Sequence, residues 1–297
     1  MATLMGVLAI LMWGLLAVLS VYTQAIPPFQ LLIMCFAIAA ALVFIKRLLQ
    51  GEACFKKPNL TKAQWLIGTL SLFGFHFCYF MAIRYAPAIE VSLIGYLWPL
   101  LLGIYVATKG TRIWALLGGA MGFVGTAVML TAGDELQANS AYWLGYALAF
   151  ACALIWSAYS WFISTANNHV EDIAWLCLLV ALLSLIPHWY WETANWDLPL
   201  SAWLSAIALG LGPVGGAFYL SDVAMKNGRQ QWLASLSFAT PVISSVCLFA
   251  FGMSELSPVL LLVIGLILLG AVVSNSGHKV TMFLQKRRKE GQAGLAK

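Results

Sequence analysis

The sequence predicts an all-α polytopic membrane protein in which ten transmembrane helices form two inverted five-helix repeats, with both termini in the cytoplasm. Three observations carry this prediction: the composition, the sidedness of the basic residues, and an internal repeat. The chain has 297 residues, of which 62% are hydrophobic and only 9% charged. Apolar runs that are long enough to cross a hydrocarbon core of about 30 Å recur from end to end. A soluble domain of any size is therefore excluded.

Ten spans account for these apolar runs, with short polar segments between them. The spans cover residues 3–22, 29–49, 64–85, 88–108, 112–131, 141–163, 172–190, 201–223, 231–252 and 258–276. Basic residues collect on one side of the membrane when the N-terminus is placed inside, as the positive-inside rule describes. Fifteen of the sixteen lie inside and only Arg84 lies outside, and the fifteen are Lys46, Arg47, Lys56, Lys57, Lys62, Lys109, Arg112, Lys226, Arg229, Lys279, Lys286, Arg287, Arg288, Lys289 and Lys297. The predicted outer loops instead carry Asp134, Glu135, Glu192, Asp197 and Glu255.

The net charge of +5 therefore reports topology, and no nucleic-acid partner is expected. The expected partner is the lipid bilayer, whose anionic headgroups would hold the basic cluster at 286–289.

Short matching segments recur at a nearly constant offset. Residues 11–14 match residues 154–157 at an offset of 143, Pro99 matches Pro241 at 142, and residues 125–128 match residues 270–273 at 145. Because five spans per half is an odd number, the second copy must enter the membrane inverted, as in many transporters with a site near the midplane. The predicted domains are a first repeat at 1–133, an inverted repeat at 141–276 and a basic cytoplasmic tail at 277–297.

Pro99 and Pro241 lie near the middle of the fourth and ninth spans. A proline in a helix cannot donate to the carbonyl four residues back, so Pro99 frees the carbonyl of Gly95 and Pro241 frees that of Ser237. In hydrocarbon a freed carbonyl needs cover from protein or a watery cavity. The prolines alone leave two interpretations open, a pair of packing kinks or a cavity with a binding site.

Two glycine-containing segments predict local geometry. Residues 210–216, with Gly212 and Pro213, are too flexible for an ordinary helix interior, so we expect a bend or broken turn that acts as a hinge or only shapes packing. Gly118 and Gly122 form a face of small residues suited to close helix packing.

Aromatic and polar residues at mid-membrane depth mark the candidate site. Ten of the thirteen tryptophans fall near span ends, as aromatic belts do, whereas Trp13, Trp98 and Trp156 lie deep. A deep indole N–H needs a partner, so we expect these three to face a cavity. His76 is an ionisable group inside a span, and Tyr79 shares its helix face. The alternative for His76 is a neutral ring bonded to a neighbouring helix.

The sequence lacks the residues that a membrane proton relay, a metal site or a phosphate-binding site would need. No carboxylate lies at the centre of a span, and no metal-binding or phosphate-binding motif occurs in a plausible context. The sequence therefore predicts no catalytic residue, no metal site and no cofactor.

Ten spans in two inverted halves, with a proline in the fourth and ninth, resemble the drug/metabolite transporter superfamily in its EamA-like branch. The stretches 75–77 and 96–99 resemble the YddG-type aromatic amino-acid exporters of bacteria. The resemblance covers essentially the whole chain. It implies a basket-like ten-helix monomer that exports amino acids and related metabolites across the bacterial inner membrane, and it carries no catalytic residue.

Taken together, the sequence leads to the hypothesis of a facilitative exporter of neutral amino acids, aromatic ones included, that works by alternating access through a central aromatic-lined cavity. The freed carbonyls would accept from the substrate ammonium, and hydroxyls with His76 would meet the carboxylate. The expected substrate-binding residues are Trp13, His76, Tyr79, Tyr96, Trp98, Trp156, Ser237, Phe238 and Thr240, and the expected kink or gating residues are Pro99, Gly212, Pro213 and Pro241. The alternatives are a proton-coupled drug or metabolite efflux transporter and, from a different class, an intramembrane enzyme built around His76, Cys78 and Tyr79.

Overall fold

All regular structure in the described part of the chain is helical. The computed structural model describes residues 1–131, 140–253, 259 and 261–277. The helices and helical turns are α1 (Ala2–Gly14), α2 (Leu16–Tyr22), α3 (Pro28–Leu49), α4 (Lys62–Tyr85), α5 (Ala88–Gly95), α6 (Trp98–Val106), α7 (Arg112–Thr131), η1 (Ser140–Tyr142), α8 (Trp143–Thr165), η2 (Val170–Asp172), α9 (Ile173–Trp191), α10 (Leu200–Leu209), η3 (Gly210–Gly216), α11 (Ala217–Asn227), α12 (Gln230–Leu236), η4 (Ser237–Ala239), α13 (Thr240–Ala250) and the helix Leu261–Gly277. The prediction of an all-helical chain is confirmed for these residues.

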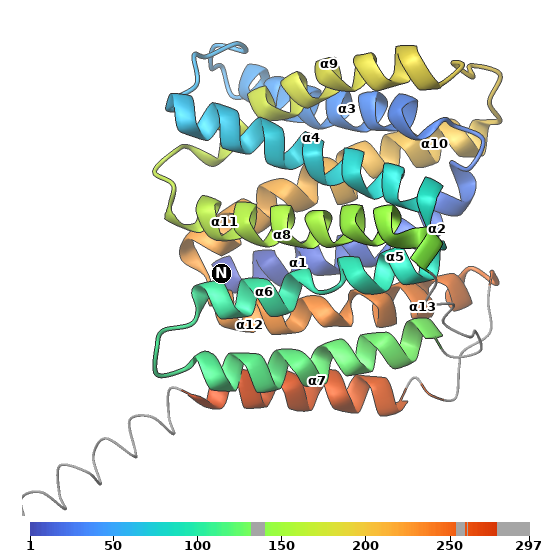
Figure 1. The fold of residues 1–297 in the computed structure, drawn as a ribbon. Coiled ribbons are helices and arrows are strands. Elements are labelled where there is room, and N and C mark those ends of the chain that lie inside the picture. The colour runs from blue at the N-terminus through green and yellow to red at the C-terminus, as the bar shows by residue number, and fades with distance from the viewer. Residues whose placement is uncertain (132–139, 254–258, 260, 278–297) are drawn as a thin grey trace, which may run out of the picture.

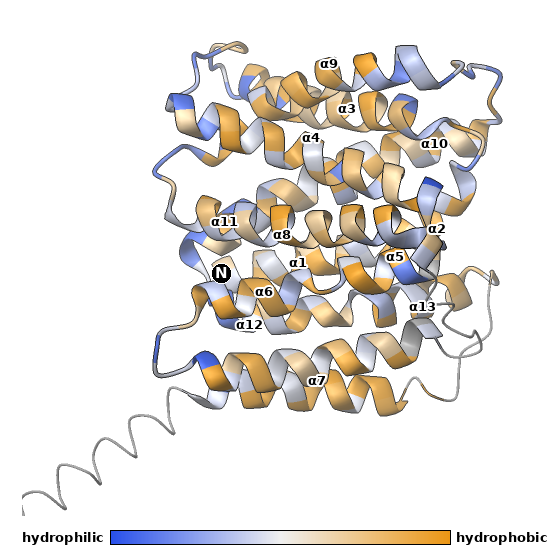
Figure 2. Cartoon of the chain, in the orientation of Figure 1, coloured by the Kyte–Doolittle hydropathy of each residue, from blue (hydrophilic) through white to orange (hydrophobic). Residues whose placement is uncertain are grey.

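The helices lie lengthwise beside one another, so that their loops gather at two opposite ends of the bundle (Figure 1). Seven helical segments are long and apolar enough to cross a membrane, and three shorter apolar helices accompany them, Glu90–Val106, Arg112–Val128 and Leu261–Gly277. Figure 2 shows hydrophobic residues along these helices and hydrophilic ones mainly towards the loops. The chain is therefore a multi-pass helical membrane protein.

In the described part of the chain, the loops that carry basic residues lie at one end of the bundle. The α3–α4, α6–α7, α8–α9 and α11–α12 connections lie at the end that holds the N-terminus (Figure 1). The predicted outer-loop acids Asp134, Glu135 and Glu255, and the basic tail beyond residue 277, lie outside the described residues.

Several predicted spans are interrupted by a break in the helix. The first span ends one helix at Gly14 and begins the next at Leu16. A Cβ at Gly14 would lie 2.3 Å from Ile243 Cγ2, and the freed carbonyl of Gly14 accepts from Ser244 Oγ at 3.0 Å. The break thus lets α13 approach α1 closely, and the sequence did not reveal it.

The predicted small-residue face of α7 packs tightly against the helix Leu261–Gly277. A Cβ at Gly118 would lie 2.3 Å from the carbonyl oxygen of Gly270, and one at Gly270 would lie 2.5 Å from that of Gly118. Both helices therefore need glycine at this crossing, and the expected close packing is confirmed.

Charged side chains connect α3 to the segments at both ends of α9. At one end the Glu192 carboxylate accepts from the backbone N–H groups of Phe29 at 2.9 Å and Gln30 at 3.1 Å, at the N-terminus of α3. At the other end the almost fully buried Arg47 pairs with Glu171 at 3.0 Å. These contacts hold α3 against α9 at both ends.

Candidate functional site

A central cavity of about 340 Å³ lies between helices from both halves of the chain. Its volume is within the roughly 300–1,000 Å³ typical of small-molecule sites. The lining residues are Trp13, Leu16, Ser20, Leu31, Leu32, Cys35, Phe75, His76, Tyr79, Phe80, Ser92, Gly95, Tyr96, Trp98, Cys152, Trp156, Leu209, Pro213, Val214, Phe218 and Thr240.

The three deep tryptophans meet in this cavity although they come from three separate helices. The ring centroids of Trp13 lie 6.3 Å from those of Trp98 and 5.9 Å from those of Trp156, and the rings of Trp98 and Trp156 lie 6.3 Å apart. All three pairs are edge-to-face, the arrangement that the aromatic quadrupole favours. The cluster presents ring faces and edges to the cavity.

The indole N–H of Trp13 finds its partner 200 positions away, where it donates to the Pro213 carbonyl at 3.0 Å. Pro213 lies in η3, a π-helical segment between α10 and α11. The expected bend is therefore a widened turn inside a continuous helix and not a broken one. Proline supplies no N–H, and the wider π turn leaves carbonyls free for such contacts. Gly212, the predicted hinge residue, does not line the cavity.

At the first proline segment, where the sequence predicts a kink, the helix breaks. Helix α5 ends at Gly95, and α6 begins at Trp98 with Pro99 in its first turn. A proline is favourable there because its missing N–H would have no helical partner. Pro99 itself is buried in packing, while Gly95, Tyr96 and Trp98 line the cavity.

The second proline segment is built differently from the first. A short 3-10 turn, η4, joins α12 to α13, and the Ser237 carbonyl accepts from the Thr240 hydroxyl at 2.8 Å. The Ser237 hydroxyl donates to Leu233 O at 2.8 Å, and Phe238 packs in a separate core. Thr240 lines the cavity, whereas Ser237, Phe238 and Pro241 are not among its lining residues. The two proline segments therefore do not form equivalent half-sites.

His76 bonds to its own helix and not to a neighbouring one. Its Nδ1 lies 2.7 Å from the carbonyl oxygen of Leu72, one turn back. A carbonyl only accepts, so Nδ1 carries the proton, and Nε2 of the neutral ring is an acceptor. Phe36 and Phe75 meet the ring edge-to-face at 5.1 and 5.0 Å. His76 therefore offers an acceptor in an aromatic setting.

Sequence reasoning missed several lining residues, among them the hydroxyls of Ser20 and Ser92. A signal existed for Ser92, which lies four positions before Tyr96 and so at a helical spacing from a predicted site residue. Ser20 lies seven positions after Trp13, but the helix breaks between them, so this spacing does not place the two residues on one helix face. Phe75 and Phe218 also line the cavity, and each lies near Trp156, with ring centroids 5.1 and 5.5 Å away.

The described residues that line the site are suited to binding a small molecule. None of these described residues is Asp, Glu, Lys or Arg. Within the described ranges no three His, Cys, Asp or Glu side chains are placed to hold a metal ion. Aromatic faces with a few hydroxyls and one imidazole match a small amphipathic ligand.

A helical membrane bundle around such a cavity is typical of transporters, and the sequence comparison gives the family. The EamA-like transporter family matches residues 1–131 and 143–276, so the chain belongs to this family. The resemblance predicted from the sequence is thus confirmed, and a family of transporters agrees with the expectation that the protein is not an enzyme.

The chain is similar to three named exporters and to one protein of known structure. The chain is 39% identical over 282 residues to the aromatic amino acid exporter YddG of Ancylobacter novellus, covering 92% of this chain and 96% of the relative. It is 25% identical to proteins of the same name from Salmonella typhimurium and Escherichia coli, each covering 82% of this chain and 86% of the relative. A protein of known crystal structure, 38% identical, has the same fold with a TM-score of 0.84 over 92% of this chain and 96% of that one.

Proposed function

We propose that the protein exports neutral amino acids, aromatic ones included, by facilitative alternating access through the central cavity. The observation that carries this proposal is the cluster of Trp13, Trp98 and Trp156, which brings three ring systems from both halves of the chain to one cavity. The relatives named as aromatic amino acid exporters support the same substrate class.

The lining chemistry suggests how an aromatic amino acid would lie. The tryptophan rings would contact its side chain and ammonium, each contact contributing about 0.5–2 kcal/mol. Nε2 of His76 is an acceptor, so it would meet the ammonium and not, as the sequence suggested, the carboxylate. The Ser237 carbonyl is already bonded to Thr240, which leaves the Gly95 segment as the proline-freed acceptor beside the cavity. Hydroxyls of Ser20, Tyr79 and Ser92 would donate to the carboxylate.

The proposed architecture is ten membrane crossings in two inverted repeats, 1–133 and 141–276, with both termini in the cytoplasm of a bacterial cell and the bundle in its inner membrane. The two separate matches to the family support the repeats. The protein would act as a monomer. Cysteine accessibility in the loop segments 55–61 and 193–199, measured from each side of the membrane, tests the orientation.

An uncoupled mechanism is favoured over proton-coupled efflux. A zwitterion carries no net charge, and the cavity-lining residues in the described part of the chain include no carboxylate to relay a proton with it. Release down a concentration gradient would be enough. Tryptophan flux from loaded proteoliposomes should therefore respond to the tryptophan gradient alone, and a strict requirement for a pH gradient would overturn the uncoupled mechanism.

The substrate site is tested by replacing its rings one at a time. Trp98→Ala should lower tryptophan efflux strongly in proteoliposomes that contain equal amounts of folded protein. Trp161→Ala is the matched control, because Trp161 is half exposed on the outer surface of α8 and does not line the cavity. Equal efflux by the two variants would refute the aromatic site.

A further inference from the structure

A second, much smaller chamber adjoins the central cavity. It has a volume of about 10 Å³ and lies between α8, the start of α9 and α11. Its lining residues are Trp156, Tyr159, Ser160, Ile163, Ile173, Phe218, Ser221, Asp222 and Met225. Trp156 and Phe218 line both spaces, and their ring centroids lie 5.5 Å apart. This ring pair is the partition between the central cavity and what we call the inner chamber.

The inner chamber has the size and the polar groups that a single water molecule requires. A volume of about 10–15 Å³ is enough for one water, provided that polar partners surround it. The Tyr159 hydroxyl is buried and has no hydrogen-bond partner among the described residues. Asp222 Oδ1 is also buried; it forms an ion pair with Lys226 Nζ at 3.1 Å but accepts no well-directed hydrogen bond from the described residues. A buried hydroxyl without a partner calls for an explanation, and an ordered water is one that a polar chamber of this size allows.

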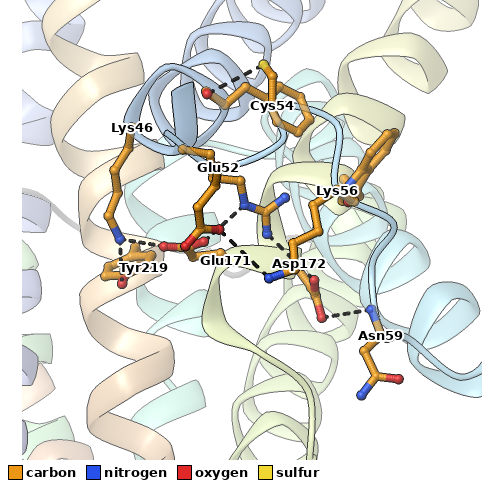
Figure 3. Close-up of polar contacts among 11 residues, drawn as sticks. Lys46, Glu52, Cys54, Lys56, Asn59, Glu171, Asp172 and Tyr219 are labelled. Atoms are coloured by element: carbon orange, nitrogen blue, oxygen red, sulfur yellow. Dashed lines mark hydrogen bonds and ion pairs between the residues drawn. The ribbon is translucent and has the colours of Figure 1, made fainter. Parts of the chain in front are cut away.

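Charged groups close the inner chamber on the side away from the cavity. Lys226 donates to Asp222 at 3.2 Å and to the Asn168 carbonyl at 3.0 Å, so it joins α11 to the α8–α9 connection. Beside them Lys46 contacts both Glu171 and Tyr219 (Figure 3). These residues lie at the end of the bundle that holds the N-terminus, because α8 and α11 both run toward that end (Figure 1).

The order of these parts describes a route. From the central cavity it passes the Trp156–Phe218 partition, the inner chamber and then the Lys226 contacts, and it ends at the N-terminal end of the bundle. We propose that the inner chamber binds one water molecule between the Tyr159 hydroxyl and the Asp222 carboxylate, and that it is the inner half of the transport path, opened when the rings of Trp156 and Phe218 separate. The second part rests on the proposed function.

The water site is tested by X-ray radiolytic labelling of the full-length native protein in lipid nanodiscs. Hydroxyl radicals formed from a bound water modify the side chains that touch it. Met225 and Tyr159, only 4% and 5% exposed, should be labelled several-fold faster than Phe238, which is 1% exposed and lines neither space, after correction for intrinsic reactivity. In Tyr159→Phe, which removes one of the two partners, labelling of Met225 should fall. Labelling of Met225 no faster than that of Phe238 would overturn the water site.

The path is tested by single cysteines in a chain whose six native cysteines are replaced. Ser221→Cys, which lines the inner chamber, should react with a charged thiol reagent applied from the N-terminal side, and faster during tryptophan efflux than without substrate. The modified protein should stop transporting. Ser184→Cys is the control, since Ser184 is fully buried in α9 and should stay unmodified.

The outcomes separate the path from the proposed function. If the native chain moves tryptophan but Ser221→Cys reacts at a rate independent of flux, or transports normally once modified, the path is wrong. If the native chain moves no tryptophan, the proposed function fails, while the radiolytic labelling still decides whether the inner chamber holds water.

Discussion

Replacing Trp13 with phenylalanine tests whether the hydrogen bond to Pro213 holds the ring cluster in place. The change removes the indole N–H that donates to the Pro213 carbonyl at 3.0 Å and keeps an aromatic ring. A hydrogen bond between membrane helices is worth about 0.6 kcal/mol on average and at most about 1.7. The smaller ring also weakens two edge-to-face pairs, each worth about 0.5–1.5 kcal/mol, with Trp98 and Trp156. We expect a total loss of about 1–2 kcal/mol.

This loss should appear both in stability and in binding. If the cluster must keep its arrangement to bind, a loss of about 1–2 kcal/mol raises the Kd for tryptophan about fivefold to thirtyfold. Titration calorimetry on the protein in nanodiscs measures the Kd, and thermal unfolding followed by circular dichroism measures stability. Trp161→Phe, on the outer surface of α8, is the control and should change neither. A Kd for Trp13→Phe within twofold of the native value would refute the reasoning.

Three further changes test the remaining contacts. Glu192→Gln weakens the charged cap on the backbone N–H groups at the start of α3, so the unfolding midpoint should fall by the equivalent of about 1–2 kcal/mol. Asp197→Asn, at an exposed position nearby in sequence, is the control and should leave the unfolding midpoint unchanged. Gly118→Ala puts a Cβ 2.3 Å from a facing carbonyl oxygen and should clearly lower the melting temperature. The Cβ of Gly265→Ala meets nothing within 4 Å, so this control should keep the native melting temperature, and equal melting temperatures of the two variants would contradict the close crossing. His76→Phe keeps a ring but removes the Nε2 acceptor, so tryptophan affinity should fall about tenfold, the effect of losing one hydrogen bond to a charged group. An unchanged affinity in titration calorimetry would rule out contact between His76 and the ammonium.

The depth of a residue in the membrane could be read from the sequence, but its partners could not. Trp13, Trp98 and Trp156 are recognisable as deep because each lies near the middle of an apolar run, and all three line the cavity. A disturbance of the helix at Pro99 could also be predicted, because proline lacks the N–H that continues the helical hydrogen bonds. Pro187 lies inside the continuous helix α9, so only the structure shows that the helix ends before Pro99. By contrast, the expectation that the Ser237 carbonyl would be free failed, since Thr240 bonds to it locally.

Other features were invisible because they depend on residues far apart in the chain. The break at Gly14 follows from the close approach of Ile243, and the π turn at Pro213 is joined to Trp13 across 200 positions. The protonated nitrogen of His76 follows from the Leu72 carbonyl, which is near in sequence, but only coordinates show that the ring turns back on its own helix.

The sequence by itself determined the class of this protein, a helical bundle in lipid. The apolar runs, the distribution of the basic residues and the family can all be recognised from the order of residues. The reason is that hydrocarbon leaves most backbone groups no partner outside their own helix, so the local composition of a segment shows whether it can span. Only the tertiary structure decided which rings meet, which carbonyls remain free and where the partition between Trp156 and Phe218 lies. Those outcomes depend on how side chains from distant helices pack, and packing is settled by all of the neighbours together.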